Sequence, residues 1–65
     1  MSQATAQSRV LAALKNAAKG LTAYQIQQIE PGHNFVFAEA LCQLTATSRV
    51  YRHPITERYV LSAIA

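Results

Sequence analysis

Apolar side chains recur at helical spacing over the first stretch of the chain, residues 6–19. They fall at intervals of three and four: Val10, Leu11, Leu14, Ala17 and Ala18. Such spacing places one apolar stripe on a helix, and alanine is the strongest helix former. Gly20 follows where a C-terminal capping glycine belongs, with Lys19 in the last turn to offset the helix dipole. We therefore expect a helix over residues 6–19, preceded by a flexible tail, residues 1–5.

Two further helices are expected in the middle of the chain. Thr22 and Gln25 stand at the spacing of a capping box, which predicts a short helix over residues 23–29 that ends at a Pro-Gly turn signal. Asn34 is a suitable N-cap for a third helix over residues 35–45. The inward-facing apolar positions of these two helices are Ile26, Ile29, Phe37, Leu41 and Leu44.

The pattern changes from helical to alternating after Ser48. Residues 49–53 and 58–62 are rich in strand-forming residues and are separated by a short segment that contains a proline. Two such runs predict a β-hairpin, which has to pack on the helices because an isolated hairpin is marginal. The expected fold class is therefore mainly α with a small β-hairpin. Tyr59 should face inward, and the residues expected to be buried are Leu14, Ile26, Phe37, Leu41, Leu44, Val50 and Leu61.

Composition limits the chain to one small domain, expected over residues 6–65. Of its 65 residues 51% are hydrophobic and 14% are charged, so it should be globular, with a stability of a few kcal/mol at best. The longest apolar stretches are interrupted by Lys15, Asn16 and Lys19, which argues against a membrane span or a membrane partner. Residues 1–8 are polar and lack the pattern of a secretion signal, so we expect a cytoplasmic protein.

The side chains that carry chemistry in other proteins form no recognisable site in this sequence. One cysteine, Cys42, cannot form an internal disulfide, and together with the well-separated His33 and His53 it cannot form a zinc framework. The sequence offers no glycine-rich phosphate loop and no nucleophile–base arrangement. We expect no enzymatic activity, no metal and no cofactor. Cys42 should be a half-buried apolar residue, and the two histidines should be turn residues.

Positive charge gathers at the two ends of the chain. The net charge is +3 with a pI of about 9.5, and residues 21–47 contain neither Lys nor Arg. The cations on either side are Arg9, Lys15, Lys19, Arg49, Arg52 and Arg58. Such a distribution suits a polyanionic partner. The alternative is that the arginines form a solvated hairpin face that discourages edge-to-edge pairing of strands.

Three segments carry a resemblance to a known family. RVLAALKNAAKGLTAYQIQQI (residues 9–29) is similar to the first two helices and the junction between them in winged helix-turn-helix domains of bacterial and phage transcription regulators. AEALCQLTATSRVYR (residues 38–52) is similar to the third helix and first wing strand of that family, and RYVLS (residues 58–62) to the returning strand. The resemblance implies a three-helix winged helix-turn-helix fold and double-stranded DNA as the partner. A small regulator from a phage or another mobile element is the implied origin.

The resemblance also implies which residues contact DNA. The third helix enters the major groove, and the hairpin, or wing, lies on neighbouring phosphates or the minor groove. Thr22 and Tyr24 would approach a phosphate, and Lys15 and Lys19 the flanking backbone. The wing would contribute Arg52, His53, Thr56 and Arg58. The outward face of the third helix would consist of Asn34, Phe35, Val36, Ala38, Glu39, Cys42 and Gln43. One copy offers few phosphate contacts, so useful affinity requires a homodimer or a cooperative array.

The third helix also supports a second hypothesis, a winged-helix module that binds a protein. Its outward face contains no Arg or Lys, although Arg is the commonest reader of bases, whereas Phe35 and Val36 are apolar. These two residues either pack in the core or form an exposed patch for a protein partner or a second copy of the chain. The sequence leaves these alternatives open.

Overall fold

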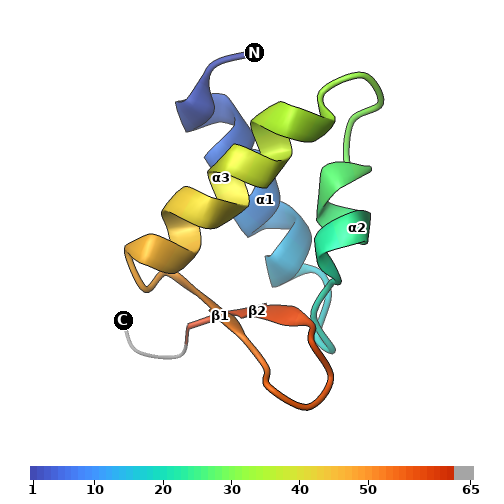
Figure 1. Ribbon diagram of the computed structural model, residues 1–65, viewed down its shortest axis with the longest axis vertical. Coiled ribbons are helices and arrows are strands. Elements are labelled where there is room, and N and C mark those ends of the chain that lie inside the picture. The colour runs from blue at the N-terminus through green and yellow to red at the C-terminus, as the bar shows by residue number, and fades with distance from the viewer. Residues whose placement is uncertain (63–65) are drawn as a thin grey trace.

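Three helices and one antiparallel hairpin make up the computed structural model, which describes residues 1–62 (Figure 1). The elements are α1 (Gln3–Lys15), α2 (Ala23–Gln27), α3 (Asn34–Ala46), β1 (Val50–Arg52) and β2 (Tyr59–Leu61). The expected class, mainly helical with a small hairpin, is confirmed. Residues 63–65, which we included in the expected domain, lie outside the described residues.

Helix α1 begins three residues earlier and ends four residues earlier than expected. It begins early because the Ser2 side chain accepts a hydrogen bond from the Thr5 backbone N–H (3.2 Å), which makes Ser2 the N-cap. Residues 3–5 therefore form the first helical turn, where we expected a tail. The helix ends at Asn16, whose side-chain amide donates to the Ala12 carbonyl (3.2 Å) and competes with further helical hydrogen bonds.

Gly20 does not cap α1 as expected, but it is the point where β2 approaches the connection between α1 and α2. Its φ is +84°, and a Cβ at this position would lie 2.6 Å from the Tyr59 carbonyl oxygen and 2.7 Å from Val60 Cγ1. The next residue, Leu21, exchanges two backbone hydrogen bonds with Tyr59, of 3.0 and 2.7 Å. Only glycine combines this backbone conformation with so close a contact.

The local sequence signal correctly predicts the start of α2 but not the cap of α3. The capping box of Thr22 and Gln25 is confirmed, although α2 is two residues shorter than expected. Asn34 lies inside α3, so its predicted role as N-cap is wrong; His33 takes that position without a side-chain cap. At its other end α3 stops with Ser48 in the left-handed region (φ 62°), which lets the Arg49 N–H donate to the Leu44 carbonyl (2.9 Å) and directs the chain into β1.

The core lies between the three helices, and the hairpin closes the end of the bundle remote from the N-terminus (Figure 1). The strands pair in the register Val50–Leu61, Tyr51–Val60 and Arg52–Tyr59. Six of the seven residues expected to be buried are buried, whereas Leu61 is only partly buried and packs against the core with Tyr59. The buried side chains are Ala6, Val10, Leu14, Ile26, Phe37, Ala40, Leu41, Leu44 and Val50. Helix α3 is the central element, because its apolar stripe contacts both other helices.

Candidate nucleic-acid interface

The face of α3 that points away from the core forms one exposed stripe. Its members follow helical spacing and are Phe35, Glu39, Cys42, Gln43 and Ala46. Phe35 is 91% exposed, so of the two alternatives left open for it, packing in the core is wrong. Val36 is partly buried against the core, and Asn34 is also only partly exposed. Cys42 is exposed, which corrects the expectation that it is half-buried.

The stripe places three predicted contact residues, Phe35, Glu39 and Gln43, on one continuous helix face. The exposure of Cys42 agrees with the outward face that the resemblance implies, whereas the expectation of a half-buried residue followed only the usual burial of cysteine. Its position seven residues after Phe35 and three after Glu39 was the signal for an exposed site. The stripe offers one amide and one carboxylate, from Gln43 and Glu39, and no cation.

The turn between the strands is held by the side chain and backbone of His53. Its Nδ1 accepts hydrogen bonds from the N–H groups of Ile55 (3.2 Å) and Thr56 (3.3 Å). The His53 carbonyl accepts from the Glu57 N–H (2.9 Å), and the His53 N–H donates to the Arg58 carbonyl (2.9 Å). His53 is thus a turn residue, as expected. We call β1, β2 and residues 53–58 together the wing, and the Nδ1 of His53 holds its tip.

Both wing arginines that we predicted to contact DNA have partners within the chain. Arg52 Nη2 lies 2.9 Å from Glu57 Oε1, with both side chains about half exposed or more. Arg58 Nη1 donates to the Gly20 carbonyl (3.1 Å). An exposed ion pair contributes only about 0–1 kcal/mol, so Arg52 can exchange Glu57 for another anion at small cost. Arg58 is more firmly placed, because its bond joins the wing to the α1–α2 connection.

The three cations of the N-terminal part of the chain lie on α1 or shortly after it. Lys15 and Lys19 are exposed, and Lys19 precedes Gly20, which contacts β2, so both lie toward the end of the molecule where the wing packs. Arg9 forms an ion pair with Glu30 that joins α1 to the segment after α2. The predicted contacts Lys15 and Lys19 are therefore near the wing, whereas Arg9 is neutralised elsewhere.

A hollow of about 290 Å³ separates the start of α2 from the wing. Tyr24, one of our predicted contacts, lines it and is 72% exposed. Thr22 also lines it, but its hydroxyl accepts from the Gln25 N–H (3.2 Å), so this oxygen caps its own helix. The whole lining consists of Thr22, Ala23, Tyr24, Arg52, Thr56, Glu57 and Tyr59.

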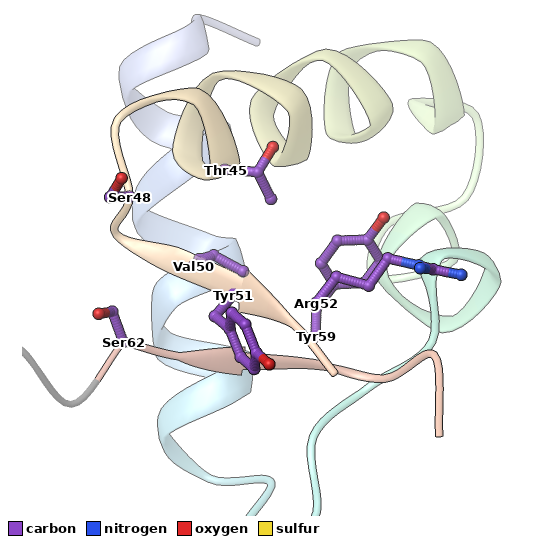
Figure 2. Close-up of a pocket in the computed structure, with 7 residues that line it drawn as sticks. All are labelled: Thr45, Ser48, Val50, Tyr51, Arg52, Tyr59 and Ser62. Carbon is purple, nitrogen blue, oxygen red and sulfur yellow. The ribbon is translucent and has the colours of Figure 1, made fainter. Parts of the chain in front are cut away.

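A second hollow, of about 540 Å³, lies between the end of α3 and the strands (Figure 2). Arg52 and Tyr59, which are cross-strand partners, line both hollows. Figure 2 shows Thr45 reaching from α3 toward the strands on which these two residues lie. The lining consists of Thr45, Ser48, Val50, Tyr51, Arg52, Tyr59 and Ser62. The sequence interpretation missed this surface, because it arises from the strand register and the direction in which the chain leaves α3.

Within residues 1–62, no group of three or more His, Cys, Asp or Glu side chains is placed to hold a metal ion. In the same part of the chain, no helix has the length and apolar character needed to cross a membrane. Comparison with protein-family models, with curated proteins and with solved structures found no match to this chain.

Proposed function

We propose that the protein binds double-stranded DNA as a small winged helix-turn-helix regulator of transcription. In this proposal the wing lies on the DNA backbone, and the exposed stripe of α3 faces the major groove. The order of elements supports it: three helices, then a hairpin whose second strand bridges back to the α1–α2 connection through Leu21 and Tyr59.

The observation that carries the proposal is the position of Arg52 and Tyr59. These two residues line both the hollow beside α2 and the hollow beside α3, so they join three elements into one surface. A cation and an aromatic hydroxyl at the centre of such a surface match the chemistry of a phosphate backbone. Lys15 and Lys19 add positive charge at the end of the molecule where the wing packs, and the net charge of +3 favours association with a polyanion.

Readout of sequence would fall to a few residues of α3. Gln43 can donate to and accept from an adenine edge, and Glu39 can accept from a cytosine amine. Asn34 is the first residue of α3 and is partly exposed, and its amide would be a second donor and acceptor for an adenine edge. With so few contacts per copy, strong binding requires two copies on adjacent half-sites.

The test is a fluorescence anisotropy titration with a labelled random duplex at rising salt. Binding should weaken steeply between about 50 and 200 mM salt, because phosphate contacts release counterions. Arg52→Ala should weaken binding about equally for all sequences and lower the salt slope by about 1. Arg58→Ala should do the same, read beside a melting curve because this side chain also bonds to Gly20. Absence of salt-dependent binding by the wild-type protein would refute the proposal, and an unchanged slope in both variants would remove the wing from it.

One observation favours a second function, binding of a protein through α3. Phe35 is 91% exposed on a stripe that carries no cation, and an aromatic side chain of this kind is a typical anchor of a protein interface. If this function holds, Phe35→Ser should abolish capture of a partner, while Gln43→Ala and Asn34→Ala leave a selected-site DNA profile unchanged. If DNA is the partner, Gln43→Ala should alter the profile by about 1–3 kcal/mol at particular base pairs. Because Phe35 lies outside the core, its replacement tests the interface without loss of folding.

A further inference from the structure

The tip of the wing presents an apolar side chain on a turn whose backbone is held by hydrogen bonds. Ile55 is 85% exposed and lies in the turn between Arg52 and Arg58. Its backbone N–H is held by His53 Nδ1 (3.2 Å), and the neighbouring Thr56 N–H is held by the same nitrogen. Bonds of 2.9 Å on either side, from Glu57 N–H to His53 O and from His53 N–H to Arg58 O, close the turn. The tip is therefore ordered by its own hydrogen bonds, independently of any partner.

An isoleucine at this place has no useful contact to make with phosphate oxygens. Ile55 has no donor, and immersing its side chain among phosphates would leave them without hydrogen-bonding partners. The minor groove of B-form DNA, about 6 Å wide, has apolar sugar walls and a floor of base edges, and apolar side chains of minor-groove proteins contact it. A narrow turn fits such a groove, and Arg52, whose exposed ion pair with Glu57 a phosphate can replace, lies where the chain enters the turn.

The chemistry of the groove floor then predicts a preference among base pairs. A·T pairs present only the acceptors adenine N3 and thymine O2, whereas each G·C pair adds the guanine N2 amine, which projects into the groove. An apolar side chain pressed on that amine covers a donor without replacing its hydrogen bond to water. Contact with Ile55 is therefore less favourable on G·C than on A·T pairs.

We propose that Ile55 enters the minor groove and makes the protein prefer A·T-rich over G·C-rich DNA. The proposal rests on the DNA-binding function proposed above and adds the groove and the residue that discriminates. It does not involve the stripe of α3, because that face is placed for the major groove.

The test uses three duplexes of equal length: alternating A·T, alternating G·C and alternating inosine·C. Inosine lacks the N2 amine, so the last two duplexes share a major groove and differ only in the minor groove. We expect the wild-type protein to bind the inosine·C duplex, and likewise the A·T duplex, about fivefold or more tighter than the G·C duplex; the decisive comparison is inosine·C with G·C, because these two share a major groove. Ile55→Ser should reduce the difference to less than about twofold, while Ile55→Val, which keeps an apolar side chain, should retain most of it.

Phe35→Ser is the matched control, since it also removes an exposed apolar side chain but from α3. It should leave the ratio of inosine·C to G·C affinity unchanged. Equal wild-type binding to inosine·C and G·C, or a ratio that persists in Ile55→Ser, would overturn the role of Ile55 while leaving DNA binding in place. Failure to bind any of the three duplexes at low salt would instead overturn the DNA-binding function itself.

Discussion

Gly20 links the helical part of the molecule to the wing through one backbone contact. Its positive φ suits glycine, and a Cβ would meet the Tyr59 carbonyl oxygen, a backbone atom that cannot rotate away. We expect Gly20→Ala to cost about 2–4 kcal/mol, because it combines left-handed strain with displacement of β2. Urea denaturation of the two proteins measures this difference directly.

Gly32 provides the matched control for this prediction. Its φ is +85°, nearly the same as that of Gly20, but nothing lies within 4 Å of a Cβ built there. Gly32→Ala should therefore cost only the backbone strain, about 1–2 kcal/mol. Equal losses in the two variants would show that the contact with β2 contributes nothing, and that only the φ angle matters.

Individual residues could be predicted from the sequence where their role depends on near neighbours. The capping box of Thr22 and Gln25 spans three residues, and its pattern is legible without the fold. Gly20 was assigned a local role as a helix cap, whereas its contact comes from residues almost 40 positions away, so no local pattern could reveal it. The prediction that Asn34 is the N-cap was wrong for a different reason. Asn34 has a high capping propensity, but α3 starts at this residue, one position earlier than expected.

At the scale of elements, the hairpin shows what the types and spacing of residues can predict and what they cannot. Alternation and a proline-containing turn correctly predicted two strands and their pairing, and the residue that faces the core, Val50. The pattern placed arginines on the wing, but it could not show that Arg52 lies beside Glu57 or that Arg58 bonds to Gly20. These partners depend on side-chain positions in three dimensions, and they determine how much positive charge the wing offers.

The ion pair of the wing leads to a prediction about DNA affinity. The Glu57 carboxylate is paired with the Arg52 guanidinium, so a phosphate has to displace this carboxylate before it can bind Arg52. Glu57→Gln keeps the shape and backbone of the turn but leaves Arg52 without an anionic partner. We expect tighter binding to random duplex, because no carboxylate has to be displaced, with a nearly unchanged salt slope, because Arg52 contacts the same phosphate in both proteins; fluorescence anisotropy measures both quantities.

Glu30→Gln is the control for Glu57→Gln, because it changes the net charge by the same amount. It also breaks an Arg–Glu pair, that of Arg9 and Glu30, and also raises the net charge by one, but it lies outside the wing. A general effect of charge would increase affinity equally in both variants. A clearly larger increase for Glu57→Gln is the outcome that the proposed interface requires, and a smaller one would contradict it.

At the scale of the whole molecule, the sequence predicted the core well because one helix organises it. Phe37, Leu41 and Leu44 recur on one face of α3, and each is buried against the other elements. The opposite face of the same helix carries Phe35, which is as apolar but 91% exposed. Hydrophobicity alone could not distinguish the two faces, and the sequence therefore allowed Phe35 to lie either in the core or on the surface. The rotation of α3 about its axis in the folded molecule decides which apolar residues are buried.

This contrast yields a prediction about the stability of the entire domain. Leu41 is 6% exposed and lies where α3 packs on its neighbours, so Leu41→Ala should remove about 2–5 kcal/mol. A single core in a chain of 65 residues rarely supplies more than about 3–5 kcal/mol, so this loss should leave a large fraction unfolded at moderate temperature. Phe35→Ala removes a larger side chain from the same helix, yet it should change the melting temperature little, because that side chain leaves no cavity. Circular dichroism melts of the two variants compare them under the same conditions. Two outcomes would contradict this assignment: a Leu41→Ala protein as stable as wild type, or a Phe35→Ala protein as unstable as Leu41→Ala. Either would mean that α3 is rotated about its axis relative to the arrangement described. The exposed stripe proposed to face DNA would then be misplaced as well.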